Sequence, residues 1–382
     1  MLLLDVSRLI WRRWSGRLPT GIDRVCLAYV EQFGANALAV VQQGNMRRIL
    51  DERSSQALFE RLRQPGQDFR SAFARLVVRT APGWLVGRSM RGARYLNVGH
   101  TGLDTPHLAP WIAREGLKAV YFIHDLIPIT HPEYCRPGEE ARHRLRMRTV
   151  LDSAAGVVAN SEDTLRSLSA YAGEVGATVP PMVAAPLGSD LRALPRRNDA
   201  VAARPTFVVV GTVEGRKNHL LLLQIWDRLA RALGDETPRL VIIGQRGWES
   251  EQAADLLDRA RSLKPYVTEL GRCSDRELAD HLAGARALLF PSFVEGYGLP
   301  LIEALHQGTP VIASDLPVFR EIGGDIPDYL DPLDGPAWRQ TIMAYAASPS
   351  PERDAQLVRL SNYRVPTWAE HFRIVEPFLD TL

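Results

Sequence analysis

Cysteine is scarce in this chain of 382 residues, and the three that occur, Cys26, Cys135 and Cys273, stand far apart. None belongs to a C-x-x-C pair, so the sequence indicates neither a zinc site nor a disulfide framework. Isolated thiols of this kind are typical of a reducing compartment, and we therefore expect a cytoplasmic protein.

Long apolar runs, repeats and low-complexity tracts are also missing. No run approaches the roughly 20 residues that a membrane-spanning helix needs. The chain starts without a basic region and reaches Asp5 at once, so its start does not resemble a signal peptide. Hydrophobic residues make up 46% and charged residues 24%, which is typical of a soluble globular protein. The length favours about two domains.

A strong net charge is absent too, because the whole chain carries only +2, and nucleic-acid binding is not indicated. Residues 1–94, however, contain 16 arginines and no lysine against 7 acidic residues, a net charge of +9. This excess fits either a solvated surface or a face that meets anionic lipid or a pyrophosphate-bearing acceptor. Trp11, Trp14 and the arginine-rich, aromatic segment 69–85 fit peripheral contact with an anionic membrane, although the segment fits a packing helix as well.

Short apolar runs alternate with helical periodicity, which predicts two doubly wound α/β domains that face each other across a cleft. We expect an N-terminal domain over 1–187, a linker over 188–204 and a C-terminal domain over 205–362. Residues 7–20 are expected to form an irregular loop. The strands are expected at 2–6, 37–41, 95–98, 118–123, 156–160, 182–186, 206–210, 239–243, 267–270, 287–290 and 310–313.

The stretch 284–308 predicts a strand, a loop with two glycines and a helix in succession. Ala287–Phe290 is an apolar run, and Pro300 stands where the first helical turn would begin. Bare N–H groups at such a helix N-terminus can bind phosphate. Glu295 and Glu303 frame the loop, and because carboxylates repel phosphate they suit the hydroxyl groups of a ribose or hexose better. The alternatives are that Glu295 is only a charge on the loop and that Glu303 lies on a solvated helix face.

Two cations, Arg216 and Lys217, stand between the expected strand 206–210 and an apolar helix. Adjacent cations at a helix N-terminus complement a pyrophosphate, which Arg can bind through two hydrogen bonds. The alternative is a solvated basic turn. We expect Lys217 to be exposed in the cleft.

Two places in the first half carry weaker signals. His124 and Asp125 follow the expected strand 118–123, and the end of a parallel strand points into the ligand crevice of an open sheet. A structural His–Asp pair is the alternative. Gly21 opens a helix, with Thr20 as its N-cap, in a phosphate-loop layout that lacks G-x-G-x-x-G and Walker spacing.

The string Glu295-Gly296-Tyr297-Gly298-Leu299-Pro300-Leu301-Ile302-Glu303 resembles the E-x7-E signature of retaining glycosyltransferases of GT-B architecture, family 4 in particular. Arg216-Lys217 and the loop that starts at His124 stand at matching places. This resemblance implies transfer of a sugar from a nucleotide-diphosphate donor by front-face displacement, without a protein nucleophile. It also implies that the last segment, 363–382, forms a helix that crosses back to the first domain.

The resemblance assigns roles residue by residue. It implies catalytic roles for His124, Glu295 and Lys217, and acceptor contacts for His124 and Asp125. The donor would bind through its diphosphate at Gly21, Arg216, Lys217, Gly298 and Leu299, its ribose at Glu303, its sugar at Glu295, Gly296 and Tyr297, and its base at Leu270 and Gly271. No cofactor or metal is implied, because the cations and the helix N-terminus would neutralise the leaving diphosphate. The chain departs from many members at Thr212, where they carry an arginine.

Similarity to bacterial polysaccharide mannosyltransferases favours GDP-mannose as the donor and a glycan or polyprenyl-diphosphate-linked acceptor. Three alternatives remain open at this point. A nucleotide-sugar epimerase of the same architecture would turn over the donor without an acceptor. A phosphorylase relative would need a lysine placed for a covalent aldehyde cofactor, and none is evident. A non-catalytic sugar-binding relative should have lost Glu295, Glu303 or Lys217, and all three are present.

Overall fold

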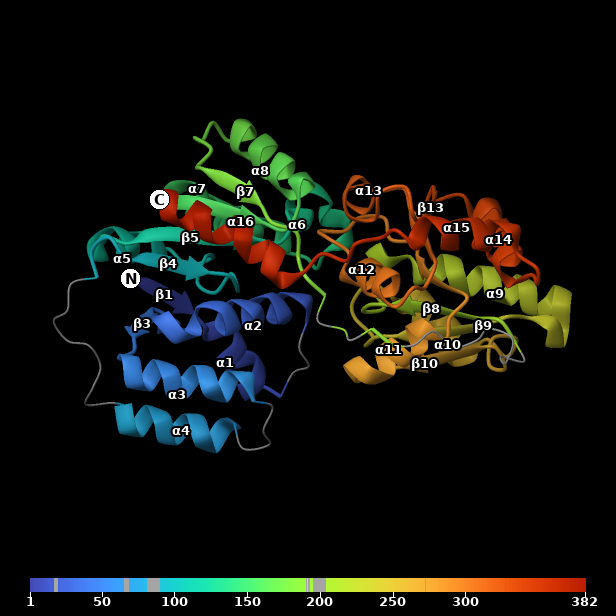
Figure 1. Cartoon of the computed structure of the whole chain (residues 1–382), viewed down its shortest axis with the longest axis horizontal. Coiled ribbons are helices and arrows are strands. Elements are labelled where there is room, and N and C mark those ends of the chain that lie inside the picture. Colours follow the sequence, from blue (N-terminus) through green and yellow to red (C-terminus); the bar gives the residue numbers. More distant parts are fainter. Residues whose placement is uncertain are drawn as a thin grey trace. The chain divides into compact units, whose positions relative to one another are not determined.

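The computed structural model of the protein describes residues 1–16, 20–64, 69–80, 90–189, 191, 193–194, 204–271 and 273–382. The chain divides into two compact units, whose helices and strands are labelled in Figure 1. Unit 1 contains Met1–Thr130, Pro137–Leu187 and Trp368–Leu382, and unit 2 contains His131–Arg136 and Gly188–Thr367.

In its described part, unit 1 is built on a seven-stranded sheet of order β3-β2-β1-β4-β5-β6-β7. Only the pair β2–β3 is antiparallel. The strands are β1 (Leu2–Asp5), β2 (Ala37–Gln43), β3 (Met46–Ile49), β4 (Arg94–Asn97), β5 (Lys118–Ile123), β6 (Ala154–Ala159) and β7 (Met182–Ala184). The helices are α1 (Ser7–Trp14), α2 (Gly21–Phe33), α3 (Glu52–Arg63), α4 (Phe69–Thr80), α5 (Leu108–Glu115), α6 (Ile127–Thr130), α7 (Glu139–Ser153), α8 (Glu162–Glu174) and α16 (Trp368–Thr381).

Unit 2 contains a fully parallel six-stranded sheet of order β10-β9-β8-β11-β12-β13 in its described part. Its strands are β8 (Thr206–Val210), β9 (Arg239–Ile243), β10 (Val267–Leu270), β11 (Ala287–Phe290), β12 (Val311–Ser314) and β13 (Asp328–Leu330). Its helices are α9 (His219–Leu233), α10 (Glu251–Arg259), α11 (Asp275–Ala283), α12 (Leu299–His306), α13 (Pro317–Gly323), α14 (Gly335–Ala346) and α15 (Pro351–Leu360).

The loop expected over 7–20 is wrong for residues 7–14, which form α1. Leu9 and Ile10 are buried on one side of this helix. The arginines and tryptophans on its other sides make contacts with distant parts of the chain. For example, Trp11 donates its indole N–H to a backbone carbonyl of β2 at 2.8 Å. Tertiary contacts thus stabilise a helix that the local sequence does not predict.

The last helix, α16, packs within unit 1, and Figure 1 shows it in red at the C-terminal end of the chain. His371 of α16 is fully buried, and its ring Nδ1 lies 3.1 Å from the carbonyl oxygen of Ala185. Its Nε2 lies 3.1 Å from the Tyr29 hydroxyl on α2. Because a carbonyl only accepts, Nδ1 donates to Ala185. Burial lowers the pKa of His371 to about 4, so Nε2 carries no proton near neutral pH and accepts a hydrogen bond from the Tyr29 hydroxyl. The imidazole is therefore neutral and ties α16 to two other elements of unit 1.

Strand order defines one point in each sheet where the chain direction across the sheet reverses. In unit 2 this switch point lies between β8 and β11, and in unit 1 it lies between β1 and β4. Open α/β sheets bind ligands at the carboxyl ends of strands at such points. The loops that follow β8 and β11 are therefore the first place to look for a site in unit 2.

Candidate functional site

The loops after β8 and β11 meet directly. The two strands pair in parallel, with Val208 opposite Leu288, so both chains leave the sheet at the same edge. The backbone N–H of Phe293, after β11, then donates to the carbonyl of Arg216, after β8, at 2.8 Å. This hydrogen bond fixes the two loops against each other.

Four charged side chains form a buried cluster at this junction. Arg216 Nε lies 2.7 Å from Glu214 Oε1, and Arg216 Nη1 lies 2.8 Å from Glu295 Oε2. Lys217 Nζ contacts the other carboxylate oxygen of Glu295, which also accepts a 2.8 Å hydrogen bond from the Ser292 hydroxyl. The side-chain exposures run from 2% for Glu214 to 21% for Arg216. Each cation therefore has a carboxylate partner away from bulk water.

The electrostatics of the cluster keep Glu295 ionised. Burial would raise the pKa of Glu295, but the nearby charges of Arg216 and Lys217 outweigh it and lower the pKa to about 2. Burial raises the pKa of Glu214, against the opposing effect of Arg216. Burial also lowers the pKa of Lys217, against the attraction of Glu295. Lys217 is only 8% exposed, so the expectation that it is exposed is wrong. Its carboxylate partner makes this burial tolerable.

Helix α12 begins where the sequence predicts, directly after the second glycine. Gly298 has a φ of 121°, and a Cβ there would lie 2.8 Å from the Phe319 ring, so the position favours glycine. Leu299 opens the helix. Tyr297 is 5% exposed and Glu303 is 3% exposed. Neither Glu303 nor Glu295 is therefore a solvated charge, and the alternative of a solvated helix face is wrong for Glu303.

The residues expected to meet the base lie farther along the same sheet edge. Leu270 ends β10, and its carbonyl accepts the N–H of Gly244 at 2.9 Å. Gly271 follows and is exposed. Because β10 lies two strands from β8, these residues are about 10 Å across the sheet from the loop that carries the two cations. A ligand that touched both places would cross the end of β9.

His124 and Asp125 follow β5 in unit 1, as predicted. His124 is 6% exposed, its Nε2–H donates to the carbonyl of Val98 at 2.8 Å, and burial lowers its pKa to about 4. Asp125 accepts the backbone N–H of Ile127 at 3.1 Å. Both side chains thus make hydrogen bonds to backbone groups of unit 1, and the acceptor role of the two residues stays a prediction.

Gly21 is the first residue of α2, and its neighbours already place a carboxylate at this helix N-terminus. The N–H and hydroxyl of Thr20 donate to Asp23 Oδ2 at 2.6 and 2.7 Å, which confirms Thr20 as the N-cap. Arg8 Nε lies 2.8 Å from Asp23, and Arg12 Nε lies 3.3 Å from it. The phosphate role of Gly21 stays a prediction.

Sequence reasoning missed three contributors to the site in unit 2. Glu214 belongs to the same turn as the two cations, and only its place before them could have suggested it. Ser292 is the second residue after β11 and donates to Glu295. Tyr134, in the segment 131–136 that belongs to unit 2, stacks on Phe293 with ring centroids 5.3 Å apart and an angle of 4° between the planes.

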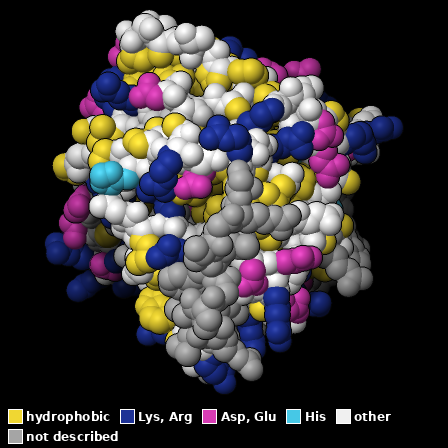
Figure 2. Space-filling model, turned by 90° about the vertical axis from the view of Figure 1, so that its left-hand side faces the viewer, with side chains coloured by type: hydrophobic (Ala, Val, Ile, Leu, Met, Phe, Trp, Pro, Cys, Tyr) yellow, Lys and Arg dark blue, Asp and Glu magenta, His cyan; other side chains and the backbone are white. Residues whose placement is uncertain are grey.

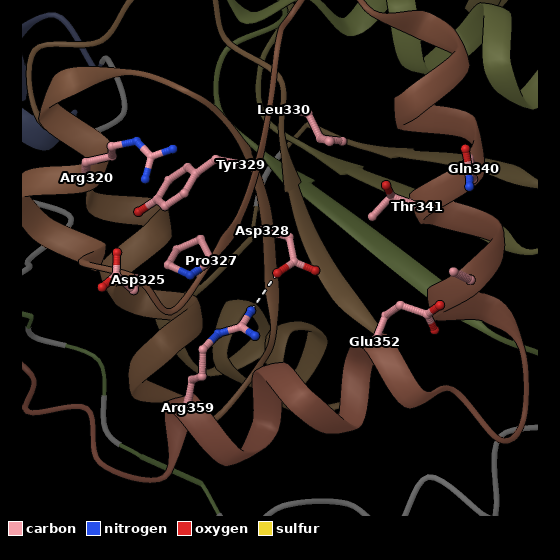
Figure 3. A pocket seen from close by; sticks show the side chains of 11 residues that line it. Arg320, Asp325, Pro327, Asp328, Tyr329, Leu330, Gln340, Thr341, Glu352 and Arg359 are labelled. Carbon is pink, nitrogen blue, oxygen red and sulfur yellow. Dashed lines mark hydrogen bonds and ion pairs between the residues drawn. The ribbon is translucent and has the colours of Figure 1, made fainter.

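A separate pocket of about 520 Å³ lies in unit 2 between β13 and helices α13, α14 and α15 (Figure 3). Its two arginines already have carboxylate partners. Arg359 Nη2 lies 2.5 Å from Asp328, and Arg320 Nε lies 2.5 Å from Asp315. Three carboxylates also line the pocket. Its charge does not suit a diphosphate, and none of the predicted site residues lines it.

Nowhere in the described ranges does a helix have the length and apolar character needed to cross a membrane. Trp14 packs against Phe73 of α4 with ring centroids 6.2 Å apart, which favours the packing interpretation at this end of the segment. Residues 81–85 lie outside the described part. Figure 2 shows Lys and Arg side chains spread over one face, with Asp and Glu between them.

No metal centre emerges from the residues that the structure describes. Within them, no three His, Cys, Asp or Glu side chains gather as they would around an ion. Cys26, Cys135 and Cys273 form no disulfide with one another.

Comparison with known proteins finds sequence similarity in this part of unit 2. Residues 192–325 match the family model of glycosyl transferases group 1. The chain is 32% identical over 240 residues to the serotype-specific mannosyltransferase WbdA of Escherichia coli, covering 57% of this chain and 29% of that protein. It is 41% identical over 136 residues to the O-antigen chain mannosyltransferase RfbU of Salmonella typhimurium, covering 36% of this chain and 37% of that protein. The chain thus spans well under two thirds of either relative.

Solved structures share the fold over the whole chain. HepE from Anabaena, in complex with UDP, aligns with 100% of this chain and 99% of its own at a TM-score of 0.64 and 16% identity. Sucrose-phosphate synthase from Thermosynechococcus elongatus aligns with 92% of both chains at a TM-score of 0.57 and 17% identity. Together with the two sheets described above, this likeness confirms the predicted fold class of two Rossmann-like α/β domains of GT-B architecture.

Proposed function

We propose that the chain is a retaining glycosyltransferase that acts in bacterial surface polysaccharide synthesis. It moves a sugar from a nucleotide-diphosphate donor, with GDP-mannose favoured, to a glycan or lipid-linked acceptor. One observation carries the proposal: Arg216 and Lys217 converge on Glu295 at the switch point of unit 2, inside the segment that matches the glycosyltransferase family model. The O-antigen mannosyltransferases among the relatives support mannose and the polysaccharide pathway.

The donor diphosphate binds to Arg216, Lys217 and the first turn of α12 at Leu299. A guanidinium, an ammonium and the backbone N–H of Leu299 at the helix N-terminus all favour phosphate oxygens. The ribose hydroxyls bind to Glu303 on the same helix, and the sugar hydroxyls bind along Glu295–Tyr297. Carboxylates suit these neutral hydroxyl donors, whereas they would repel the phosphates.

The reaction proceeds on one face of the donor sugar. The bond between the anomeric carbon and the diphosphate oxygen breaks while the acceptor oxygen forms its bond from the same side. The acceptor proton passes to the leaving diphosphate oxygen, so no protein nucleophile is required and the anomeric configuration is retained. Arg216 and Lys217 stabilise the negative charge that develops on the leaving group. His124 and Asp125 orient the acceptor.

The acceptor side of the proposal involves the cytoplasmic face of a membrane. A polyprenyl-diphosphate carrier lies in an anionic bilayer, and the net charge of +9 in residues 1–94 favours reversible contact with such a surface. The donor would come from the cytosol.

A panel of nucleotide sugars tests the proposal. Purified protein is incubated with GDP-mannose, UDP-glucose, UDP-N-acetylglucosamine and a dTDP-sugar, first alone and then with short mannose oligosaccharides. We expect slow hydrolysis of GDP-mannose alone and faster transfer with acceptor. NMR should show that the product keeps the anomeric configuration of the donor. Inverted product would contradict retention, and interconversion of the donor without transfer would favour the epimerase alternative.

A further inference from the structure

The cluster at the switch point is balanced in charge. Arg216 and Lys217 supply two positive charges, and Glu214 and Glu295 supply two negative ones at contact distance. A diphosphate that binds both cations therefore meets no excess of positive charge. It must compete with a carboxylate that the protein itself provides.

The two carboxylates differ in how they hold the cations. Glu295 uses one oxygen for Arg216 Nη1 and the other for Lys217, so it bridges both cations as a diphosphate would. Glu214 contacts Arg216 from the Nε edge. A ligand that bridges the same two cations must take the place of Glu295, and it can leave Glu214 undisturbed.

The backbone around the two carboxylates fits this difference. Glu295 lies in the loop between β11 and α12 and is followed by Gly296 and Gly298, which permit backbone conformations that other residues resist. Glu214 lies in the turn after β8, where the Lys217 N–H donates to its carbonyl at 3.0 Å. Displacing Glu295 would expose both cations to a ligand, whereas displacing Glu214 would expose only Arg216.

We propose that Glu295 is an internal substitute for the donor diphosphate: it holds Arg216 and Lys217 together until the diphosphate displaces it, and the released carboxylate then binds the sugar of the donor. Glu214 is a positioning residue that keeps the Arg216 guanidinium in place during this exchange. The inference rests on the proposed function, because it takes a nucleotide-diphosphate sugar as the ligand. It makes the sugar contact dependent on prior binding of the diphosphate.

The exchange has a consequence for binding that a purely attractive role of Glu295 would not have. Glu295→Gln removes the carboxylate that competes with the diphosphate and leaves the Lys217 ammonium without its carboxylate partner. Free GDP or UDP should therefore bind more tightly to this variant than to the wild type, by about tenfold, the scale of one hydrogen bond between charged groups. The same variant should transfer sugar more slowly, because the amide cannot replace the carboxylate at the sugar hydroxyls.

Calorimetric titration of the full chain tests the exchange. GDP, UDP and the corresponding nucleosides are titrated into wild type, Glu295→Gln and Asp328→Asn. The last variant is a matched control, because it removes the carboxylate that pairs with Arg359 elsewhere in unit 2. Only Glu295→Gln should gain affinity, and only for the diphosphates. The nucleosides report on the base site, and partly unfolded protein would lower the stoichiometry rather than raise the affinity.

A second variant covers the case in which Glu295→Gln does not fold. Glu295→Asp keeps the charge but withdraws it by one methylene, so its affinity for the diphosphate should also exceed that of the wild type, by a smaller factor. If the wild type binds GDP or UDP and the folded Glu295 variants bind it equally or more weakly, this inference is overturned while the proposed function is not. Wild-type protein that binds neither GDP nor UDP would overturn both this inference and the proposed function.

Discussion

Replacing Lys217 with methionine should cost less folding stability than replacing Glu295 with glutamine, although both changes break the same ion pair. The difference follows from what each substitution leaves behind. Lys217→Met leaves the Glu295 carboxylate with Arg216 at 2.8 Å and the Ser292 hydroxyl at 2.8 Å. Glu295→Gln leaves the Lys217 ammonium without its carboxylate, with the face of the Phe290 ring 5.0 Å away.

The size of each effect can be estimated from the burial of the pair. Removing one partner of a buried ion pair typically costs about 3–5 kcal/mol, because an uncompensated charge remains. We expect Lys217→Met near the lower end of this range and Glu295→Gln near the upper end. The double variant leaves neither charge, so its cost should fall short of the sum of the single costs by about 2–3 kcal/mol, the upper part of the range for coupled neighbours.

Urea denaturation of the three variants measures these costs, with amide hydrogen exchange in β11 and α9 assigning the loss to unit 2. In a donor assay, folded Lys217→Met should also lose about 10²–10³ in kcat, the scale for one preorganised electrostatic partner. Two results would refute the reasoning. One is additivity of the two substitutions, which would mean that the pair is not coupled. The other is unchanged donor turnover, which would remove Lys217 from the site.

Three further predictions concern pH, metal and membrane. Burial lowers the pKa of His371 to about 4, whereas a histidine in the unfolded chain has a pKa near 6.5. Between these two values the unfolded chain binds more protons than the folded protein. The contribution of His371 to the free energy of unfolding should therefore be complete above about pH 6.5 and fall by about 1.4 kcal/mol per pH unit towards pH 4. From pH 7 to pH 5, the urea midpoint should drop less for His371→Gln than for the wild type. Equal drops would contradict the role of His371 in this pH dependence. Sugar transfer should persist in excess EDTA because Arg216 and Lys217 supply the positive charge; complete loss that Mg²⁺ or Mn²⁺ restores would assign that charge to an ion. The protein should sediment with anionic but not neutral vesicles at low salt, with about 1 kcal/mol per basic residue near the surface and a loss as salt rises; no sedimentation at low salt would favour a soluble acceptor.

The inner strands were the most predictable elements, because their limits are visible in the sequence, whereas the edge strands β3 and β13 were not predicted. The runs expected at 206–210 and 287–290 match β8 and β11 residue for residue. Apart from Thr206 both runs are apolar, as is typical of a parallel strand buried on both faces, and each is followed at once by a residue that interrupts regular structure. For β8 that residue is Gly211, and for β11 it is Pro291. Local composition alone was sufficient for these elements.

Helix α1 was not predictable in the same way, because its stabilising contacts are distant. Val6 at its N-cap makes no side-chain capping hydrogen bond, so the usual start signal is missing. The polar side of the helix is held by groups far along the chain: Arg8 pairs with Asp23, and Arg13 donates to backbone carbonyls at the end of α3, including that of Gln64. Side chains that fit a basic loop in the sequence are therefore structural contacts in the fold.

The burial of Lys217 follows from strand order rather than from local sequence. A lysine in a loop is exposed by default, and only a partner makes its burial tolerable. That partner, Glu295, lies 78 residues later in the chain. Because β8 and β11 are adjacent parallel strands, the loops that follow them leave the same sheet edge, so the two side chains must share a site once the order is known. Apolar runs do not distinguish this strand order from others. The sequence motifs therefore predicted the cations and the carboxylates separately, and their ion pair became evident only from the strand order of the sheet.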